Sequence, residues 1–202
     1  MSSLQQAGPA GLTTNPFSHT RYTITRPWLT FLGRKFYVHG PDGQVVLFVR
    51  HKIMTWKDEW NVYSDDTEQL PLLRVKARQA IAMNIITDVF DAQTGELVGT
   101  VRNKGLKSIL RDTWEILAEG DLVRGQFTED SNALLRRFIP MLVGHWHMEL
   151  DGQVVAKLDQ VFRWFVKEFT LELTAPKQAD PRLVIGCAML ALMREVMRES
   201  RS

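Results

Sequence analysis

The chain is poor in cysteine and carries little excess charge of either sign. Cys187 is the only cysteine among 202 residues, so no disulfide can form within the chain, and the protein fits a reducing compartment. Lysine and arginine total 25 and aspartate and glutamate 23, a formal net charge of +2. A chain this close to neutrality is not a polycation suited to nucleic acid. Recognition of an anion would therefore depend on a local cluster of cations.

The sequence also lacks the motifs of common enzyme classes. It contains no Gly-x-Ser-x-Gly elbow, no phosphate-binding Gly-Lys-Ser/Thr loop, no His-Glu-x-x-His and no dinucleotide fingerprint. Cys187 lies in an apolar segment, where burial would raise the thiol pKa and suppress its reactivity. We therefore predict no catalytic residue and no cofactor. An enzyme with an unfamiliar site in the mouth of the fold remains as an alternative.

The N-terminal residues 1–19 have neither the cationic stretch nor the apolar core of a secretory signal. Their serine, glutamine, glycine, proline and threonine content predicts a disordered lead-in. We expect a single domain over residues 20–202, and a cytoplasmic protein that can act peripherally at a membrane.

Short β-type runs separated by Gly or Asp-Gly turns dominate residues 21–174. This pattern predicts hairpins, because tight turns need the positive φ that these residues tolerate. One short helix is expected over residues 131–138. The hairpins carry turns at 40–43, 91–95, 119–121 and 151–152. Together they favour an antiparallel meander.

The segment after Asp180 predicts a helix over residues 181–199, because Asp180 is a good N-cap and Pro181 suits the first helical position. Residues 183–193 carry no charge, yet a membrane span needs about 20 apolar residues, so no transmembrane span is predicted. A helix that is apolar on every side is buried on every side, which a closed β-barrel around it would achieve. The alternatives are a helix between a sheet and a dimer partner, or a tail anchor. The expected core positions are Leu183, Val184, Ile185, Met189, Leu190, Leu192 and Met193.

Two rows of cations are candidates for anion binding. If the rows are neighbours, they would form a patch suited to anionic headgroups. The alternative is a solvated outer barrel face, where cations serve solubility. The rows comprise Arg74, Lys76 and Arg78, and Arg102, Lys104, Lys107 and Arg111.

Two weaker signals concern metal ions and membranes. His145 and His147 would share one face of a strand, but a third ligand would have to come from elsewhere, so we predict no metal site. Tryptophan lies beside a cation at Trp56-Lys57 and Arg163-Trp164, and such pairs suit a membrane interface as well as a partly buried barrel position.

This pattern, with the runs Leu72–Gln79, Asp88–Gly95 and Lys104–Trp114, resembles the LURP-one-related family, which is grouped with phospholipid scramblases and the tubby C-terminal domain. The resemblance implies an antiparallel barrel of about twelve strands around a central hydrophobic helix. It also implies work at membrane phospholipid, as headgroup binding or lipid movement. Scramblases carry an acidic calcium-binding stretch before the last helix and cysteine-rich segments, and this chain has neither.

We therefore expect a non-enzymatic, mainly β domain that binds anionic phospholipid headgroups or related anions at a membrane surface. The alternatives are a scaffold or regulatory module that binds a protein partner or, less in keeping with the charge, nucleic acid.

Overall fold

Strands that follow one another along the chain pair with one another until the ring closes. The computed structural model describes residues 15–27, 34–51, 59–81, 84–104, 113–130, 143–164 and 166–199. Within these ranges the strands are β1 (Arg21–Pro27), β2 (Arg34–His39), β3 (Val45–His51), β4 (Trp60–Tyr63), β5 (Pro71–Ile81), β6 (Asn84–Asp91), β7 (Leu97–Lys104), β8 (Thr113–Leu117), β9 (Val123–Glu129), β10 (His145–Leu150), β11 (Gln153–Val161) and β12 (Val166–Leu173). The helices are the short 3-10 helix η2 (Glu119–Asp121) and α2 (Pro181–Glu199).

Pairing of the first strand with the last closes the barrel. β1 and β12 run antiparallel, with Ile24 opposite Phe169, and every other strand pairs with its sequence neighbours. The four predicted hairpins form as β2–β3, β6–β7, β8–β9 and β10–β11. The prediction of a closed antiparallel barrel is confirmed, and closure leaves none of the twelve described strands as an edge free to pair with another chain.

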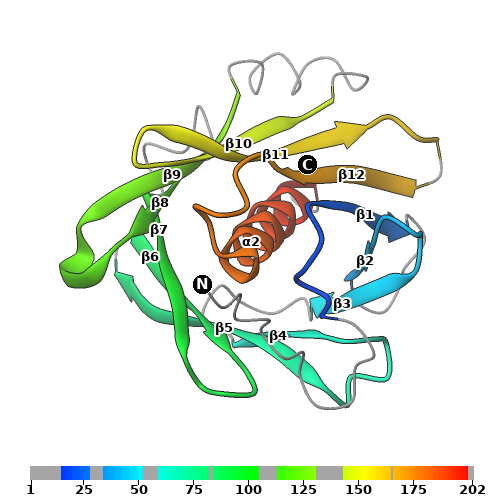
Figure 1. Ribbon diagram of the computed structural model, residues 1–202, viewed down its shortest axis with the longest axis horizontal. Coiled ribbons are helices and arrows are strands. Elements are labelled where there is room, and N and C mark those ends of the chain that lie inside the picture. Colours follow the sequence, from blue (N-terminus) through cyan, green and yellow to red (C-terminus); the bar gives the residue numbers. More distant parts are fainter. Residues whose placement is uncertain are drawn as a thin grey trace, which may run out of the picture.

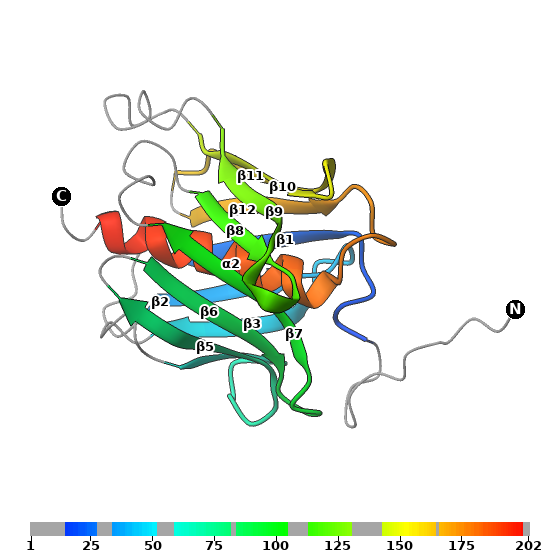
Figure 2. The same ribbon diagram turned by 90° about the vertical axis from the view of Figure 1, so that its left-hand side faces the viewer.

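Helix α2 lies along the inside of the barrel. Figure 1 looks down the barrel and shows the helix enclosed by strands, and Figure 2 shows it running from one end to the other. Small residues let strands approach it: a Cβ added at Gly186 would lie 3.1 Å from Val89. At Gly99 in β7, an added Cβ would lie 2.7 Å from Leu183 of the helix. The expected core residues, Leu183, Val184, Ile185, Met189, Leu190, Leu192 and Met193, are all buried.

Alternation along the strands turns one face of the sheet toward the helix. In β10, Trp146, Met148 and Leu150 are buried, while the residues between them are partly exposed. This is the period of two expected for a strand with one buried and one wet face. The outer surface therefore carries the polar residues that alternate with the core.

Antiparallel pairing places the connections at two opposite ends. α2 begins at the end where β6 joins β7, because Arg182 contacts Asp91 and Glu96 there. It stops at the end where β11 joins β12, because Glu195 contacts Lys167. We call these the helix-start end and the helix-stop end. Even-numbered strands end at the helix-start end, and odd-numbered strands end at the helix-stop end.

The chain enters β1 through a turn. The Asn15 side chain accepts a hydrogen bond from the backbone N–H of Phe17, and Tyr22 donates its hydroxyl proton to the carbonyl of Pro16. Phe17 packs against the core. Residues 15–19 of the expected lead-in thus make folded contacts, whereas residues 1–14 and the helix expected at 131–138 lie outside the described residues.

Candidate functional site

The first predicted row and Arg102 of the second row lie on one outer face of the barrel. Val75 of β5 is buried, so Arg74 and Lys76 on either side of it point outward. Arg102 projects from β7, two strands away, with β6 between the rows. Lys104 ends β7, and its side chain lies outside the described atoms, as do Lys107 and Arg111 altogether.

Arg78 connects β5 to β6 and β7. Its guanidinium donates to Asp88 of β6, from Nε at 2.9 Å and from Nη2 at 2.7 Å. The same Nη2 lies 3.3 Å from the hydroxyl oxygen of Thr100 on β7, and that hydroxyl donates to Asp88 at 2.7 Å. The hydrogen bonds with Asp88 raise the pKa of Arg78 above its ordinary value. A pair with this geometry fixes Arg78 in place.

Arg102 is held in the same way. Its Nε and Nη2 lie 2.8 Å and 2.6 Å from one carboxylate oxygen of Glu115 on β8, and both side chains are mostly buried. Arg78 and Arg102 are therefore neutralised by close carboxylates, and breaking either pair would leave a poorly solvated charge behind.

Arg74 and Lys76 are held more loosely. Each lies 3.9 Å from the same residue, Glu59, and the side chains of Arg74 and Lys76 are 43% and 58% exposed. Arg74 also sits 5.1 Å from the ring centre of Phe90 on β6, an arrangement that favours a cation. Two cations facing one carboxylate leave an excess positive charge on this part of the surface.

Strand pairing brings Glu59 to the loosely held cations. Glu59 directly precedes β4, and Trp60 of β4 pairs with Val75, which lies between Arg74 and Lys76. Farther along, Arg78 lies 3.4 Å from Asp121 of η2, in the β8–β9 connection at the helix-start end. The loosely held cations thus lie beside β4, whereas the fully paired Arg78 reaches across β6 to β7 and to η2.

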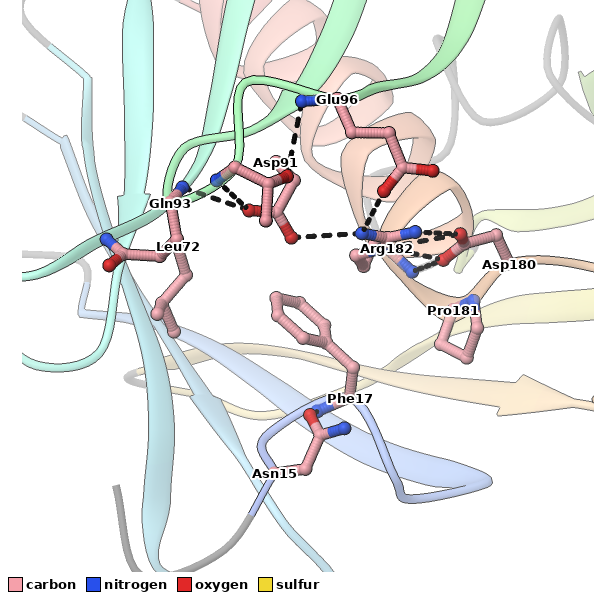
Figure 3. Close-up of a pocket in the computed structure, with 10 residues that line it drawn as sticks. Asn15, Phe17, Leu72, Asp91, Gln93, Glu96, Asp180, Pro181 and Arg182 are labelled. Carbon is pink, nitrogen blue, oxygen red and sulfur yellow. Dashed lines mark hydrogen bonds and ion pairs between the residues drawn. The ribbon is translucent and has the colours of Figure 1, made fainter. Parts of the chain in front are cut away.

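A pocket at the helix-start end has the opposite character. Its volume is about 270 Å³, and Figure 3 shows Arg182 at its centre, facing Asp180, Asp91 and Glu96, with Phe17 across the opening. Arg182 lies 2.7 Å from Asp180, 2.9 Å from Asp91 and 3.2 Å from Glu96. The three carboxylates are already engaged with this guanidinium. The ion pairs that line the pocket therefore fasten the first turn of α2 to the barrel.

The histidine pair and the cysteine take structural positions. Nδ1 of His145 lies 2.7 Å from Asp159, and Nδ1 of His147 lies 2.7 Å from Asp130. Among the residues that the structure describes, no three His, Cys, Asp or Glu side chains are grouped to hold a metal ion. Cys187 is buried in α2, and its burial raises the pKa of the thiol to about 12.

The sequence patterns did not reveal the carboxylates that pair with the cations of the outer face. Glu59, Asp88 and Glu115 come from different segments, and only the register β4–β5–β6–β7–β8 brings them to their cations. Charge alternation along a single strand carries no signal for a partner on the next strand.

Comparison with known proteins gives the family. A family profile described as LURP-one-related matches residues 45–191, nearly three quarters of the chain. No curated protein matches the sequence. In the described part of the chain, no helix is long and apolar enough to cross a membrane. The residues quoted for the resemblance, the barrel and the profile agree, and the chain belongs to the LURP-one-related family.

Proposed function

We propose that this protein is a non-catalytic barrel that binds anionic phospholipid headgroups at a membrane surface. The observation that carries the proposal is the loose sharing of Glu59 by Arg74, which is partly exposed, and Lys76, which is exposed, on the outer face of β5. The proposal keeps as sequence predictions Lys104, the last residue of β7, and Lys107 and Arg111, which follow it in the chain.

The distances explain why these two cations are available. A contact of 3.9 Å is longer than a hydrogen bond of 2.7–3.2 Å, and exposed ion pairs contribute at most about 1 kcal/mol. Exchanging Glu59 for a phosphate oxygen therefore costs little. Arg78 and Arg102, by contrast, would have to give up close pairs with Asp88 and Glu115. A headgroup is expected to bind Arg74 and Lys76 first.

The barrel interior supports binding on the outside. Barrels that hold a small ligand keep an open cavity between their strands. Here α2 occupies that volume, with Ile185, Ala188 and Met189 fully buried against the strands. An interior filled in this way favours a surface function over chemistry on a bound substrate.

Vesicle sedimentation tests the proposal. Wild-type protein should sediment with phosphatidylserine-containing vesicles at low salt and be released as salt rises, because salt screens the attraction. Each cation near an anionic surface contributes about 1 kcal/mol, so Arg74→Glu with Lys76→Glu should weaken binding by more than about tenfold. Lys157→Glu with Lys177→Glu is the matched control, because both lysines are exposed, lie elsewhere and change the net charge equally.

Two outcomes would overturn the proposal. Wild-type protein that fails to sediment with any anionic vesicle at low salt would leave the scaffold alternative in its place. Equal losses in the two double variants would show a response to net charge alone and remove the site from β5. Circular dichroism of each variant establishes that it is folded.

A further inference from the structure

Exposed apolar side chains gather at the helix-start end of the barrel. Among the described residues, seven large apolar side chains are exposed, and five of them lie at this end: Val45, Leu97, Leu122, Val123 and Val154. Each stands at or next to the first residue of an odd-numbered strand, and odd-numbered strands begin where even-numbered strands end. Leu122 is 70% exposed, the most of the five. Apolar surface left in water at one end of a fold marks an interaction site.

Three of these side chains lie on adjacent elements. β8 pairs with β7 on one side and with β9 on the other, so the start of β7 and the connection that enters β9 are neighbours. Leu97 is the first residue of β7, and Leu122 and Val123 lead into β9. The carbonyl of Leu122 accepts a hydrogen bond from the N–H of Ala118, which holds this connection in place. We call Leu97, Leu122 and Val123 the apolar rim.

Acidic residues dominate the same end. All six connections that follow even-numbered strands lie within the described residues, and their acidic members are Asp42, Asp65, Asp66, Glu68, Glu96, Glu119, Asp121, Asp151 and Asp180. Lys177 is their one basic residue. Four arginines of the strands and of α2 pair with members of this set, namely Arg50, Arg78, Arg124 and Arg182. With these arginines included, nine acidic residues face five basic ones, so an excess of four negative charges remains.

The pocket at this end shares the negative charge. Asp91, Glu96 and Asp180 line it, whereas Arg182 supplies its one positive charge. Glu96 contacts Arg182 through Oε2 and its side chain is 60% exposed, so its other carboxylate oxygen is open to a donor. Phe17 lies across the opening, where its ring would face a bound cation (Figure 3). The volume of about 270 Å³ is smaller than the roughly 300–1,000 Å³ of pockets for drug-sized ligands and suits a single side chain.

We propose that the helix-start end binds a basic, partly apolar segment of another protein, which places a lysine or arginine side chain in the pocket beside Glu96 and covers the apolar rim. Charge identifies this occupant. The negative excess repels anionic phospholipid, nucleic acid and the same end of a second copy of this chain, and it attracts a basic segment. Apolar side chains of that segment would remove the rim from water. The inference goes beyond the proposed headgroup binding and does not depend on it.

Two labelled peptides test the apolar rim by fluorescence anisotropy. One alternates lysine with leucine and the other lysine with serine, so they carry equal charge and differ in apolar content. The wild type should bind the lysine–leucine peptide at least about tenfold more tightly, because its leucines cover the rim. Leu97→Ser with Leu122→Ser should abolish this advantage and leave binding of the lysine–serine peptide unchanged. The matched control is Phe162→Ser with Trp164→Ser, which removes two exposed apolar side chains at the helix-stop end and should bind both peptides like the wild type.

Amide variants test the contribution of charge. Glu96→Gln with Glu119→Gln removes two negative charges from the helix-start end and should weaken the binding of both peptides by about threefold or more. Asp159→Asn with Glu168→Gln removes the same charge from β11 and β12 toward the helix-stop end and should have a smaller effect. A photoreactive benzoylphenylalanine at position 122 should crosslink to the lysine–leucine peptide, whereas the same group at position 164 should not. Circular dichroism of each variant establishes that it is folded.

Three results would overturn the inference. Equal affinity of the wild type for the two peptides would show attraction by charge alone, and equal losses in the two amide variants would show that the charge acts from no particular end. Self-association of the wild type that Leu97→Ser with Leu122→Ser abolishes would assign the rim to a second copy. Each of these results leaves headgroup binding intact, because no vesicle is present, and failure of the wild type to sediment with vesicles leaves the peptide result intact.

Discussion

Arg182, in the first turn of α2, and Asp91, at the end of β6, are 91 positions apart in the chain and 2.9 Å apart in space. Arg182 also binds Asp180, so one guanidinium joins the helix cap to the rim of the barrel. The core helix is therefore fixed at one end by charge as well as by apolar packing.

Removal of this guanidinium should destabilise the fold. Arg182→Ala leaves Asp91 and Asp180 without their shared cation in a mostly buried position, which costs about 3 kcal/mol. Chemical denaturation should show the loss, and Arg182→Lys should recover part of it. Arg124→Ala breaks an exposed pair with Asp151 and should cost less than about 1 kcal/mol. Equal losses of stability in Arg124→Ala and Arg182→Ala would contradict the role of Arg182 in fastening the helix to the barrel.

Acid should weaken the same connection. Burial alone would raise the pKa of Asp91, but hydrogen bonds from the backbone N–H groups of Thr94 and Gln93 and from Arg182 outweigh it and hold the pKa below its ordinary value. A carboxyl whose pKa is lowered on folding stabilises the native state above its unfolded pKa of about 3.9, and this contribution is lost as the pH falls toward the folded pKa.

Asp91→Asn tests this pH dependence. Its melting temperature should fall less than that of the wild type between pH 5 and pH 3, since the titrating group is gone. Asp66→Asn is a control at an exposed position of the same end. Parallel pH profiles for wild type and Asp91→Asn would show that Asp91 makes no such contribution.

A glycine in β9 permits close contact between strands. A Cβ added at Gly125 would clash with the backbone carbonyl oxygen of Glu149, on the paired strand β10. Because backbone cannot move aside as a side-chain tip can, Gly125→Ala should cost about 3 kcal/mol or more, or prevent folding. Gly95→Ala, where the added Cβ meets no atom within 4 Å, should cost about 1 kcal/mol through its positive φ. Denaturant midpoints compare the two variants.

Deletion of residues 180–202 should unfold the domain. Seven large side chains of α2 are buried, and at about 1.5 to 3 kcal/mol each they contribute roughly 10 to 20 kcal/mol of gross burial. The net stability of a domain is about 5 to 15 kcal/mol. The truncated chain should be insoluble or melt without cooperativity in calorimetry. A soluble truncation with a cooperative transition would refute the role of α2 as the core.

The sequence was most informative where one element determined its own environment. An uncharged stretch from Leu183 to Met193, flanked by charge and too short to span a membrane, favoured burial on all sides, and this led to the barrel before any pairing was known. The hairpins followed from local turn chemistry, as at Asp151 and Gly152, both of which have positive φ.

The candidate site was harder to predict from the sequence, because it depends on the register of the paired strands. The row Arg74, Lys76 and Arg78 reads as three equivalent cations along β5, but Arg78 meets Asp88 closely and the other two share Glu59 loosely. That difference arises from the bulge between Ala77 and Gln79 and from strand pairing, neither of which leaves a periodic signal in one chain. The sequence showed Trp164 beside Arg163, but it gave no sign that the Trp164 side chain is exposed.

The placement of α2 after every strand sets the order in which a nascent chain can fold. β1 must wait for β12, since Tyr22 pairs with Leu171, and all twelve strands leave the ribosome before the helix that fills them. Until then the inward faces of the strands have no core to cover. Folding governed by such distant pairings is slow and exposes apolar surface. The nascent protein is therefore expected to depend on chaperones until residue 199 has emerged.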